Sequence, residues 1–243
     1  MQSPRFNDEY GCTYVLIEPG QFIMGDTIGD GLPRESPPHT VEISQPFFIG
    51  QRPVTQMHWD SIMGNNPSKF QDGWSSGLRP VENISWHNCM TFLAKLNKKY
   101  DEVEFLSLRG IWRLPTESEW EYCARSGTTT KWSCGDLDSE IDEYVWHAGN
   151  AGASTREVGL KKSNKWDLHD MNGLVAEWCQ DNFRNDYSEH SMQSPFVNES
   201  DIYCHRGGNW FTESDSTRCS ARGFSPASKT NDGIGMRLVW EPK

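Results

Sequence analysis

Two carboxylates in the C-terminal half of the chain have a spacing that suits a metal ion. Asp170 and Glu177 are seven residues apart, and Gly173 lies between them. Calcium takes carboxylate and backbone carbonyl oxygens as ligands, and a glycine lets the chain turn tightly between them. The segment is therefore a candidate calcium loop. A solvated acidic turn is the alternative interpretation.

Cysteine and histidine form no comparable pattern in the sequence. The seven cysteines include no CxxC pair, which argues against a zinc ribbon or a thioredoxin-like site. Cys89 and Cys123 lie within helical patterns, so we expect the cysteines to be buried thiols. One or two disulfide bonds are the alternative interpretation. The seven histidines include no HxxxH pair, and the sequence contains no P-loop, GxGxxG or GxSxG motif.

The strands that would position such residues are short. Residues 14–17 and 21–24 read as two strands around the turn Glu18-Pro19-Gly20, and residues 39–43 alternate between apolar and polar side chains. After about residue 128 helical periodicity is weak, and short apolar runs alternate with turn residues. We therefore expect many short strands joined by long loops.

Three helices are predicted in the first half. Residues 56–63 follow Thr55 as a plausible N-cap, and a longer helix follows Ser85. The segment Thr116-Glu-Ser-Glu119 has the form of a capping box, and Trp120 is expected to face the core. Short helices with many strands predict one α+β domain over residues 1–243.

Composition limits the functions that this chain can serve. Its formal net charge is −11, which argues against nucleic-acid binding and against an anionic membrane surface. Hydrophobic residues make up 35%, and no run is long enough to span a membrane. The N-terminus shows no apolar leader, so we expect a cytoplasmic chain as given, with surface display left open.

Several segments, taken in order, resemble the formylglycine-generating enzyme (sulfatase-modifying factor) family. The most specific is Trp112-Arg-Leu-Pro-Thr-Glu-Ser-Glu-Trp-Glu-Tyr122. The others are Phe22-Ile-Met-Gly25, Glu35-Ser-Pro-Pro-His-Thr-Val41, Arg52-Pro-Val-Thr55, Pro80-Val-Glu-Asn-Ile-Ser-Trp86, Asp170-Met-Asn-Gly-Leu-Val-Ala-Glu-Trp-Cys179, Arg206-Gly-Gly-Asn-Trp210 and Gly235-Met-Arg-Leu238. The resemblance covers nearly the whole chain and implies a C-type lectin-like fold. It also implies that calcium is bound by the side chains of Asp170 and Glu177 and by the carbonyls of Gly173 and Val175.

The same resemblance argues against catalysis. Enzymes of this family hold copper on two cysteines that follow the Arg-Gly-Gly motif, and a soft Cu(I) ion favours thiolates. Counting from Arg206, this chain has Thr212 and Thr217 at those positions, and Cys219 stands alone nearby. A hydroxyl is a poor Cu(I) ligand. We therefore expect neither copper nor enzymatic activity. Arg237 is expected to have a structural role, either in a buried salt bridge or in capping backbone carbonyls.

Another branch of the family is similar to this chain: the variable proteins of diversity-generating retroelements. They display hypervariable residues between an entry like Arg206-Gly-Gly and an exit like Gly235-Met-Arg-Leu-Val239. The resemblance implies a variable ligand-binding region at about residues 206–239. Its candidate contact residues are Trp210, Phe211, Thr212, Ser214, Asp215, Ser216, Thr217, Gly223, Phe224, Ser225, Ser228, Thr230, Asn231 and Asp232.

Codon chemistry gives a modest test of that branch. Adenine-specific errors in an AAC codon can produce a codon for every candidate contact residue except Trp210. They cannot produce a codon for Glu213 or Lys229. Those three residues are either framework or arguments against diversification. Small polar residues with a few aromatics suit an adaptable binding surface, as in antibody loops.

Two other hypotheses stay open. The chain is either a non-diversified accessory or interaction domain of the family, or a copper-dependent oxidase despite Thr212 and Thr217. On the leading hypothesis its partner is a protein or another macromolecule that contacts the C-terminal surface. Phe211 and Phe224 are then the expected aromatic anchors.

Overall fold

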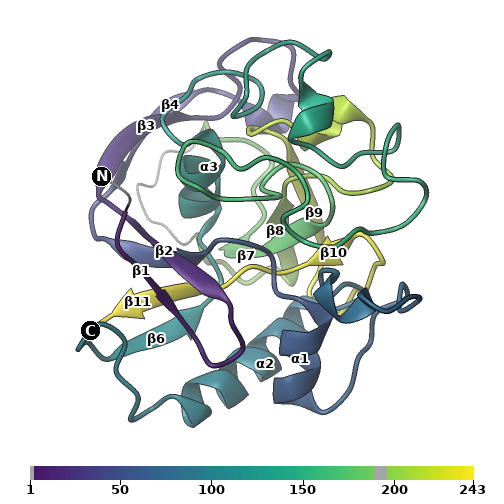
Figure 1. The fold of residues 1–243 in the computed structure, drawn as a ribbon. Coiled ribbons are helices and arrows are strands. Elements are labelled where there is room, and N and C mark those ends of the chain that lie inside the picture. The colour runs from purple at the N-terminus through teal and green to yellow at the C-terminus, as the bar shows by residue number, and fades with distance from the viewer. Residues whose placement is uncertain (1–2, 189–195) are drawn as a thin grey trace.

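A computed structural model describes residues 3–188 and 196–243. It consists of two larger sheets, a separate hairpin and a few short helices (Figure 1). The strands are β1 (Arg5–Asn7), β2 (Thr13–Ile17), β3 (Gly20–Met24), β4 (His39–Ile43), β5 (Phe47–Gly50), β6 (Gly110–Arg113), β7 (Ala176–Asn182), β8 (Ile202–Arg206), β9 (Arg222–Pro226), β10 (Ile234–Gly235) and β11 (Val239–Pro242).

The first sheet joins the two ends of the chain. Its strand order is β1-β2-β5-β11-β6, so the C-terminal strand lies between two strands from the first half. Val239 is opposite both Ile49 and Arg113. Figure 1 shows the two chain ends on the same side of the molecule. Because β11 is held on both edges, the segment that precedes it is anchored at its exit.

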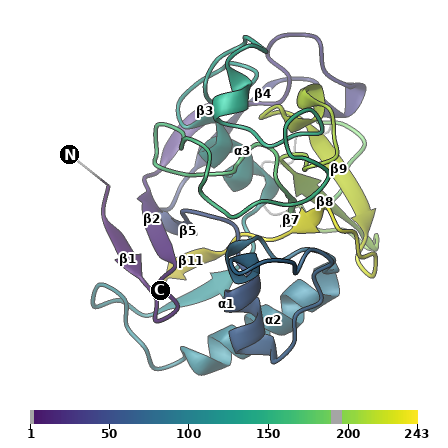
Figure 2. The same ribbon diagram turned by 45° about the vertical axis from the view of Figure 1, so that its right-hand side comes forward.

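The second sheet carries the part of the C-terminal segment from Arg206 to Gly235, before the chain enters β11 of the first sheet. Its order is β10-β7-β8-β9, and only the β10–β7 pair is parallel. Ile234 is opposite Ala176, and Arg206 is opposite both Glu177 and Arg222. Figure 2 shows this sheet and β11 on different sides of α3.

The predicted strands around Glu18-Pro19-Gly20 exist but do not pair with each other. β2 pairs with β1 and β5, whereas β3 pairs with β4 through five residue pairs from Gly20↔Ile43 to Met24↔His39. The turn therefore sends the chain from one sheet to another. Local sequence set the turn, and the partners were decided by tertiary packing.

The helices begin where the sequence predicts. Thr55, Ser85 and Thr116 each accept a hydrogen bond from a backbone N–H of the first turn. Ser85 and Thr116 also form reciprocal capping boxes, with Asn88 and Glu119. The helices are α1 (Gln56–Met63), α2 (Trp86–Lys99) and α3 (Glu117–Arg125), with short 3-10 turns η1 (Pro33–Glu35), η2 (Ser76–Leu78), η3 (Ile141–Glu143) and η4 (Ser214–Thr217).

Large aromatic rings fill the space between these elements. Trp120 on α3 is fully buried, as predicted, and packs in one core cluster with Cys123. All seven cysteines are free, and Cys89 and Cys123 are buried, as expected. Each large ring removes much apolar area from water, which explains how a chain with 35% hydrophobic residues folds.

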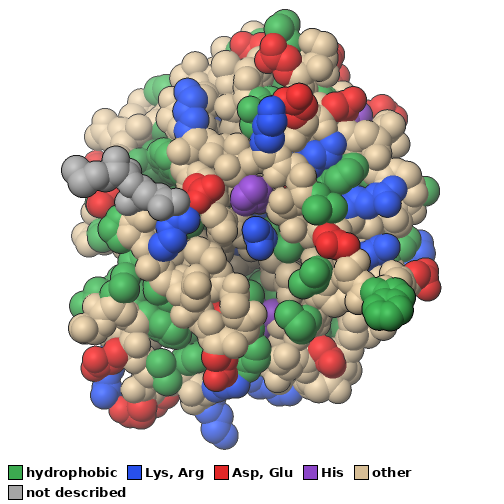
Figure 3. Space-filling model, in the orientation of Figure 1, with side chains coloured by type: hydrophobic (Ala, Val, Ile, Leu, Met, Phe, Trp, Pro, Cys, Tyr) green, Lys and Arg blue, Asp and Glu red, His purple; other side chains and the backbone are tan. Residues whose placement is uncertain are grey.

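Charges of both signs are interspersed on the face shown in Figure 3. Lys and Arg side chains lie there beside Asp and Glu side chains rather than in one field. Within the described residues, no helix combines the length and the apolar character needed to cross a bilayer.

Candidate ligand-binding surface

A buried charge network fixes the entry of the C-terminal segment. The Arg206 guanidinium, at the end of β8, donates to Glu117 (Nη1–Oε1, 3.0 Å), to Glu121 and to the Cys219 carbonyl (2.8 Å). Arg222 on β9 also donates to Glu117, with Nε 2.6 Å from Oε1. Burial would raise the pKa of Glu117, but Arg222 and Arg206 outweigh it and hold that pKa at about 2. Two strands are thereby tied to α3.

Two glycines turn the chain directly after this network. Gly207 and Gly208 have φ of +101° and +65°, values that other residues rarely adopt. A Cβ on Gly208 would lie 2.6 Å from the Ser216 carbonyl oxygen. The turn therefore requires glycine, which explains the Arg-Gly-Gly motif as framework.

Arg237 fixes the exit. It is fully buried, and its Nε lies 3.0 Å from both carboxylate oxygens of Glu177. Its other nitrogens donate to the carbonyls of Gly50 and His169, both at 2.8 Å. Trp120 Nε1 donates to Glu177 as well, at 2.8 Å. The expected buried salt bridge is present, and it links both sheets to α3.

Within the predicted calcium set of Asp170, Gly173, Val175 and Glu177, Asp170 Oδ1 is buried without a hydrogen-bond partner, whereas Glu177 has no free oxygen to offer. Both oxygens of Glu177 are already bonded to Arg237, and one of them also accepts from Trp120. The guanidinium thus supplies the positive charge that a cation would have supplied. Burial raises the pKa of Asp170, whose Oδ2 accepts from the Gly159 N–H at 2.6 Å. The Glu177 carboxylate is a structural ion-pair partner rather than a free ligand.

The two threonines at the copper positions have different environments. Thr212 is half-buried, and its hydroxyl bonds to the backbone N–H and carbonyl of Asn209 at 2.9 and 3.0 Å. Thr217 is fully buried, accepts from Trp132 Nε1 at 2.9 Å and donates to the Ser214 carbonyl at 2.6 Å. Cys219 is buried, and burial raises its pKa to about 11. This region thus holds two bonded hydroxyls and one neutral thiol.

The candidate contact residues divide by exposure. Thr217 is buried, so it is not accessible to a ligand, and Gly223 is half-buried beside the His205 ring, which would have to move if a Cβ were added there. The exposed residues are Phe211, Asp215, Ser216, Phe224, Ser228 and Thr230, and the half-buried ones are Trp210, Thr212, Ser214, Ser225, Asn231 and Asp232. Glu213 and Lys229, considered as framework, are exposed.

Strand alternation separates the two aromatic anchors. Gly223 and Ser225 face His205, and Ser225 Oγ lies 3.3 Å from its Nε2. Phe224 therefore points to the other face of β9, where its ring stacks on Phe183 with centroids 4.2 Å apart. Phe211 packs instead on Trp210, at 4.9 Å. The two phenylalanines do not belong to one patch.

A pocket of about 190 Å³ lies at the surface between η4 and β9. Thr212, Ser216 and Gly223 line it from the candidate region, and Arg34 lines it from the loop before β4. Arg34 Nε is buried and has no hydrogen-bond partner, and its guanidinium lies 5.7 Å from the centroid of the Phe224 ring. The pocket therefore offers hydroxyls beside one incompletely bonded cation.

The floor of the pocket carries one ion pair and one neutral imidazole. Arg218 donates to Glu35 with contacts of 2.6 and 3.1 Å, and Ser220 also donates to Glu35, at 3.0 Å. Burial lowers the pKa of His205 to about 4, so its ring is uncharged at pH 7. The floor is thus rigid and nearly neutral, which leaves Arg34 to set the charge at the opening.

Sequence reasoning missed one side of this surface. Phe70, from the loop between α1 and α2, packs edge-on against Trp210 at 5.1 Å, and Lys69 pairs with Asp232. These two contacts hold the loop to the C-terminal segment, and Trp210 Nε1 donates to the Asp232 carbonyl at 2.9 Å, which joins the two residues that the loop contacts. Nothing in the local sequence of Lys69 or Phe70 signals this contact. For Arg34, the sequence offers one indication, which is its position directly before the family-like segment that starts at Glu35.

Comparison with known proteins identifies the class. The sulfatase-modifying factor enzyme 1-like domain matches residues 3–242, and the chain belongs to this family. The fold is that of the formylglycine-generating enzymes and of the C-type lectin-like variable proteins, as predicted. Treponema denticola variable protein 1 is similar with a TM-score of 0.85 and 30% identity, covering 95% of each chain.

Two relatives show how broad the family is. Chaperone protein LppX of Paenibacillus barcinonensis is 26% identical and covers 79% of each protein. The formylglycine-generating enzyme of Streptomyces coelicolor is 23% identical, covering 93% of this chain and 88% of the enzyme. Some relatives are much longer, since the chain spans 37% of the serine/threonine-protein kinase pkn1 of Chlamydia pneumoniae.

Proposed function

We propose that this chain is a non-catalytic ligand-binding protein, of the variable-protein type encoded with diversity-generating retroelements. The observation that carries the proposal is the contrast within residues 206–239. Arg206 and Arg237 are buried in ion pairs, whereas Phe211, Asp215 and Ser216 between them are exposed. The likeness to Treponema denticola variable protein 1 supports the same interpretation.

Binding would centre on the aromatic cluster of Phe70, Trp210 and Phe211 and on the neighbouring pocket. Phe211 is 43% exposed, so a ligand can cover a large apolar ring that is already held in place by Trp210. Aromatic anchors of this kind carry most of the binding energy in protein interfaces. Thr212 and Ser216 then supply polar contacts at the pocket edge. The ligand class that fits is a folded protein with an acidic group placed near Arg34.

The experiment that tests diversification is sequencing of the 3′ end of the gene from many cells of the source population. The proposal predicts a near-copy of this segment beside a reverse-transcriptase gene, with differences confined to adenines. It also predicts substitutions at the codons of Phe211, Asp215, Ser216 and Thr230, and none at those of Arg206 and Arg237. Identical 3′ ends without a neighbouring copy would contradict it.

A non-diversified accessory domain is the second candidate. The similarity to Chaperone protein LppX supports it, because that protein shares most of the chain length. In that case the same surface would bind one fixed partner, and the 3′ end would be constant while Phe211→Ala still weakened binding. Oxidation is tested separately, with Cu(I) and a cysteine-containing peptide. The proposal predicts no formylglycine product, and turnover would overturn it.

A further inference from the structure

A second group of reactive side chains lies away from β8 and β9, beside the hairpin of β1 and β2. Asp8 comes from the turn between these strands, Cys12 directly precedes β2, and His58 lies in the first turn of α1. One donor atom from each of the three lies within 4.8 Å of the other two. Within the described residues, no other group of histidine, cysteine and carboxylate donors is as close.

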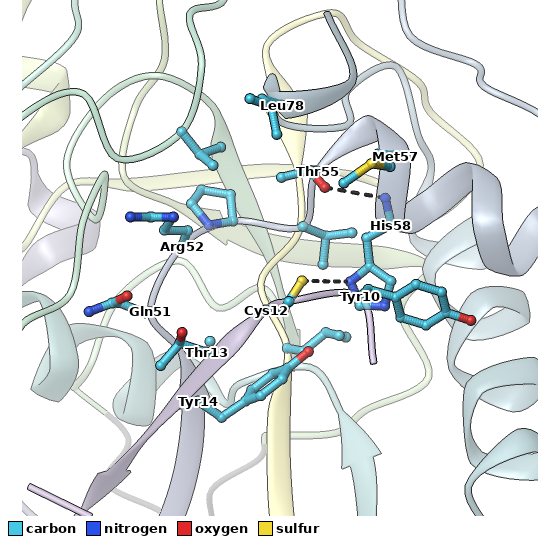
Figure 4. A pocket seen from close by; sticks show the side chains of 16 residues that line it. Tyr10, Cys12, Thr13, Tyr14, Gln51, Arg52, Thr55, Met57, His58 and Leu78 are labelled. Carbon is cyan, nitrogen blue, oxygen red and sulfur yellow. Dashed lines mark hydrogen bonds between the residues drawn. The ribbon is translucent and has the colours of Figure 1, made fainter. Parts of the chain in front are cut away.

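The distances within this group are those of ligands around an ion. Cys12 Sγ lies 3.3 Å from His58 Nδ1 (Figure 4). Asp8 Oδ2 lies 3.9 Å from His58 Nε2. Zinc bonds of 2.0–2.3 Å place tetrahedral ligands about 3.3–3.8 Å apart. The imidazole presents Nδ1 to Cys12 and Nε2 to Asp8, and one ion binds only one of these nitrogens. Nε2 is the nitrogen without a hydrogen-bond partner, so the ion would lie between Nε2 and Asp8, and the Cys12 side chain must rotate away from Nδ1 to reach it.

His58 provides an independent sign that a partner is missing. Its side chain is 1% exposed, and its Nε2 is buried without a hydrogen-bond partner. A buried, unpaired imidazole nitrogen is costly unless something binds it. The 3.9 Å separation from Asp8 is too long for a hydrogen bond.

The surroundings hold Asp8 and His58 in place. Asp8 Oδ1 accepts the backbone N–H groups of Tyr10 and Cys12, both at 2.9 Å, and its Oδ2 accepts from the Tyr14 hydroxyl at 3.0 Å. The Tyr10 ring stacks on His58 with centroids 4.7 Å apart. Bonds of this kind orient metal ligands in known sites.

An ion can reach the group from a pocket of about 150 Å³. Cys12 and His58 line this pocket, together with Tyr10, Tyr14 and Arg52 (Figure 4). Cys12 is half-buried, so its sulfur borders the opening. Two of the three ligands border the pocket, and zinc sites with three protein ligands keep an exchangeable fourth position.

A cysteine nucleophile activated by His58 is the competing interpretation. In this chain the imidazole lacks an orienting hydrogen bond to its second nitrogen, because Asp8 is too distant from Nε2 for that role. A thiolate and an imidazole together with a carboxylate instead match the ligand preference of zinc.

We propose that Asp8, Cys12 and His58 bind one zinc ion, with the fourth coordination position facing the pocket. Binding displaces the thiol proton of Cys12 to solvent, so one proton is released for each ion bound. The site is independent of the C-terminal surface, because none of its three ligands lies in residues 206–239.

The test is titration of the chelator-treated full chain with Zn²⁺ in a calorimeter, followed by Co²⁺ as a spectroscopic probe. The proposal predicts one ion per chain and a thiolate-to-cobalt charge-transfer band. Cys12→Ser should remove the band and weaken zinc binding by at least about a hundredfold, because outer-shell changes alone cost 10- to 100-fold. Cys134→Ser, which changes another half-buried free thiol, should bind as the parent does.

The melting temperature serves as the control that each variant is folded. Excess Zn²⁺ should raise it for the parent and for Cys134→Ser but not for Cys12→Ser. Absence of stoichiometric binding by the parent would overturn the proposal without reference to any variant. Equal zinc affinity of the parent and Cys12→Ser would overturn it as well.

Discussion

The two ends of the segment from residue 206 to residue 239 are buried, whereas its middle is exposed. At the ends, Arg206 and Arg237 are fully buried, and their guanidinium groups are bonded to carboxylates and carbonyls. In the middle, Phe211, Asp215 and Ser216 are exposed. A protein that must change its contacts and keep its fold needs this separation. Substitutions should therefore lower the free energy of unfolding strongly at the ends of the segment and hardly at all in its middle.

The largest effect is expected at the exit of the segment. Arg237→Ala leaves the buried carboxylate of Glu177 with Trp120 as its remaining side-chain partner. Breaking a buried ion pair on one side costs about 3–5 kcal/mol, so this loss is expected in the free energy of unfolding. Urea denaturation at pH 7 measures it. Lys229→Ala, at an exposed residue of the same segment, should stay within about 0.5 kcal/mol.

Two adjacent residues give the sharpest local contrast. Thr217→Val leaves the buried Trp132 Nε1–H without its acceptor, which should cost about 1–3 kcal/mol. Ser216→Ala, one position earlier and exposed, should change stability by less than about 0.5 kcal/mol. Thermal unfolding of both variants checks the pair. Equal losses would mean that η4 is framework throughout.

A titrating carboxylate supports the aromatic side of the surface. Glu82 accepts the N–H groups of Lys69 and Phe70, and its other oxygen is buried without a partner. Burial raises its pKa to about 7 from an ordinary 4.5. Because the folded state holds this proton more tightly, its contribution to stability is complete below pH 4.5 and is lost as the pH rises through 7.

Glu82→Gln removes this titration and keeps the acceptor oxygen. Between pH 5 and pH 8 the parent should lose about 1–2 kcal/mol of stability relative to the variant. Chemical denaturation at both pH values measures the difference, in which groups common to both proteins cancel. A constant difference across this range would show that Glu82 is ionised throughout.

The smallest effect is expected for calcium. Because Arg237 occupies both oxygens of Glu177, calcium and its chelator should shift the melting temperature by less than about 1 °C. Differential scanning fluorimetry measures this shift. A saturable rise with calcium that Asp170→Asn abolishes would restore the metal interpretation of Asp170 to Glu177.

Much of the fold could be predicted from the sequence, because its signals are local or shared by the family. The caps at Thr55, Ser85 and Thr116 act within a single turn of helix and are all present. The segment around Trp112 to Tyr122 pointed to the family that the whole-chain match confirms. The buried salt bridge of Arg237 was expected as the structural role of that residue and is present.

The rest depended on contacts between distant segments. The pairing of β2 with β5, the burial of Thr217 under Trp132 and the contact of Phe70 with Trp210 have no local signature. The group of Asp8, Cys12 and His58 was invisible because its ligands do not have the short spacing of known zinc motifs.

The most direct test of the candidate ligand-binding surface in residues 206–239 is selection of binders from a library. Phe211, Asp215, Ser216 and Thr230 are randomised together, and the folded variants are selected against lysozyme. A matched library randomises four exposed residues of the loop before β6, Asp101, Glu102, Val103 and Glu104. The account predicts that the first library keeps its fold and yields binders at least about tenfold more often than the second. Equal yields, or loss of folding in most members of the first library, would contradict it.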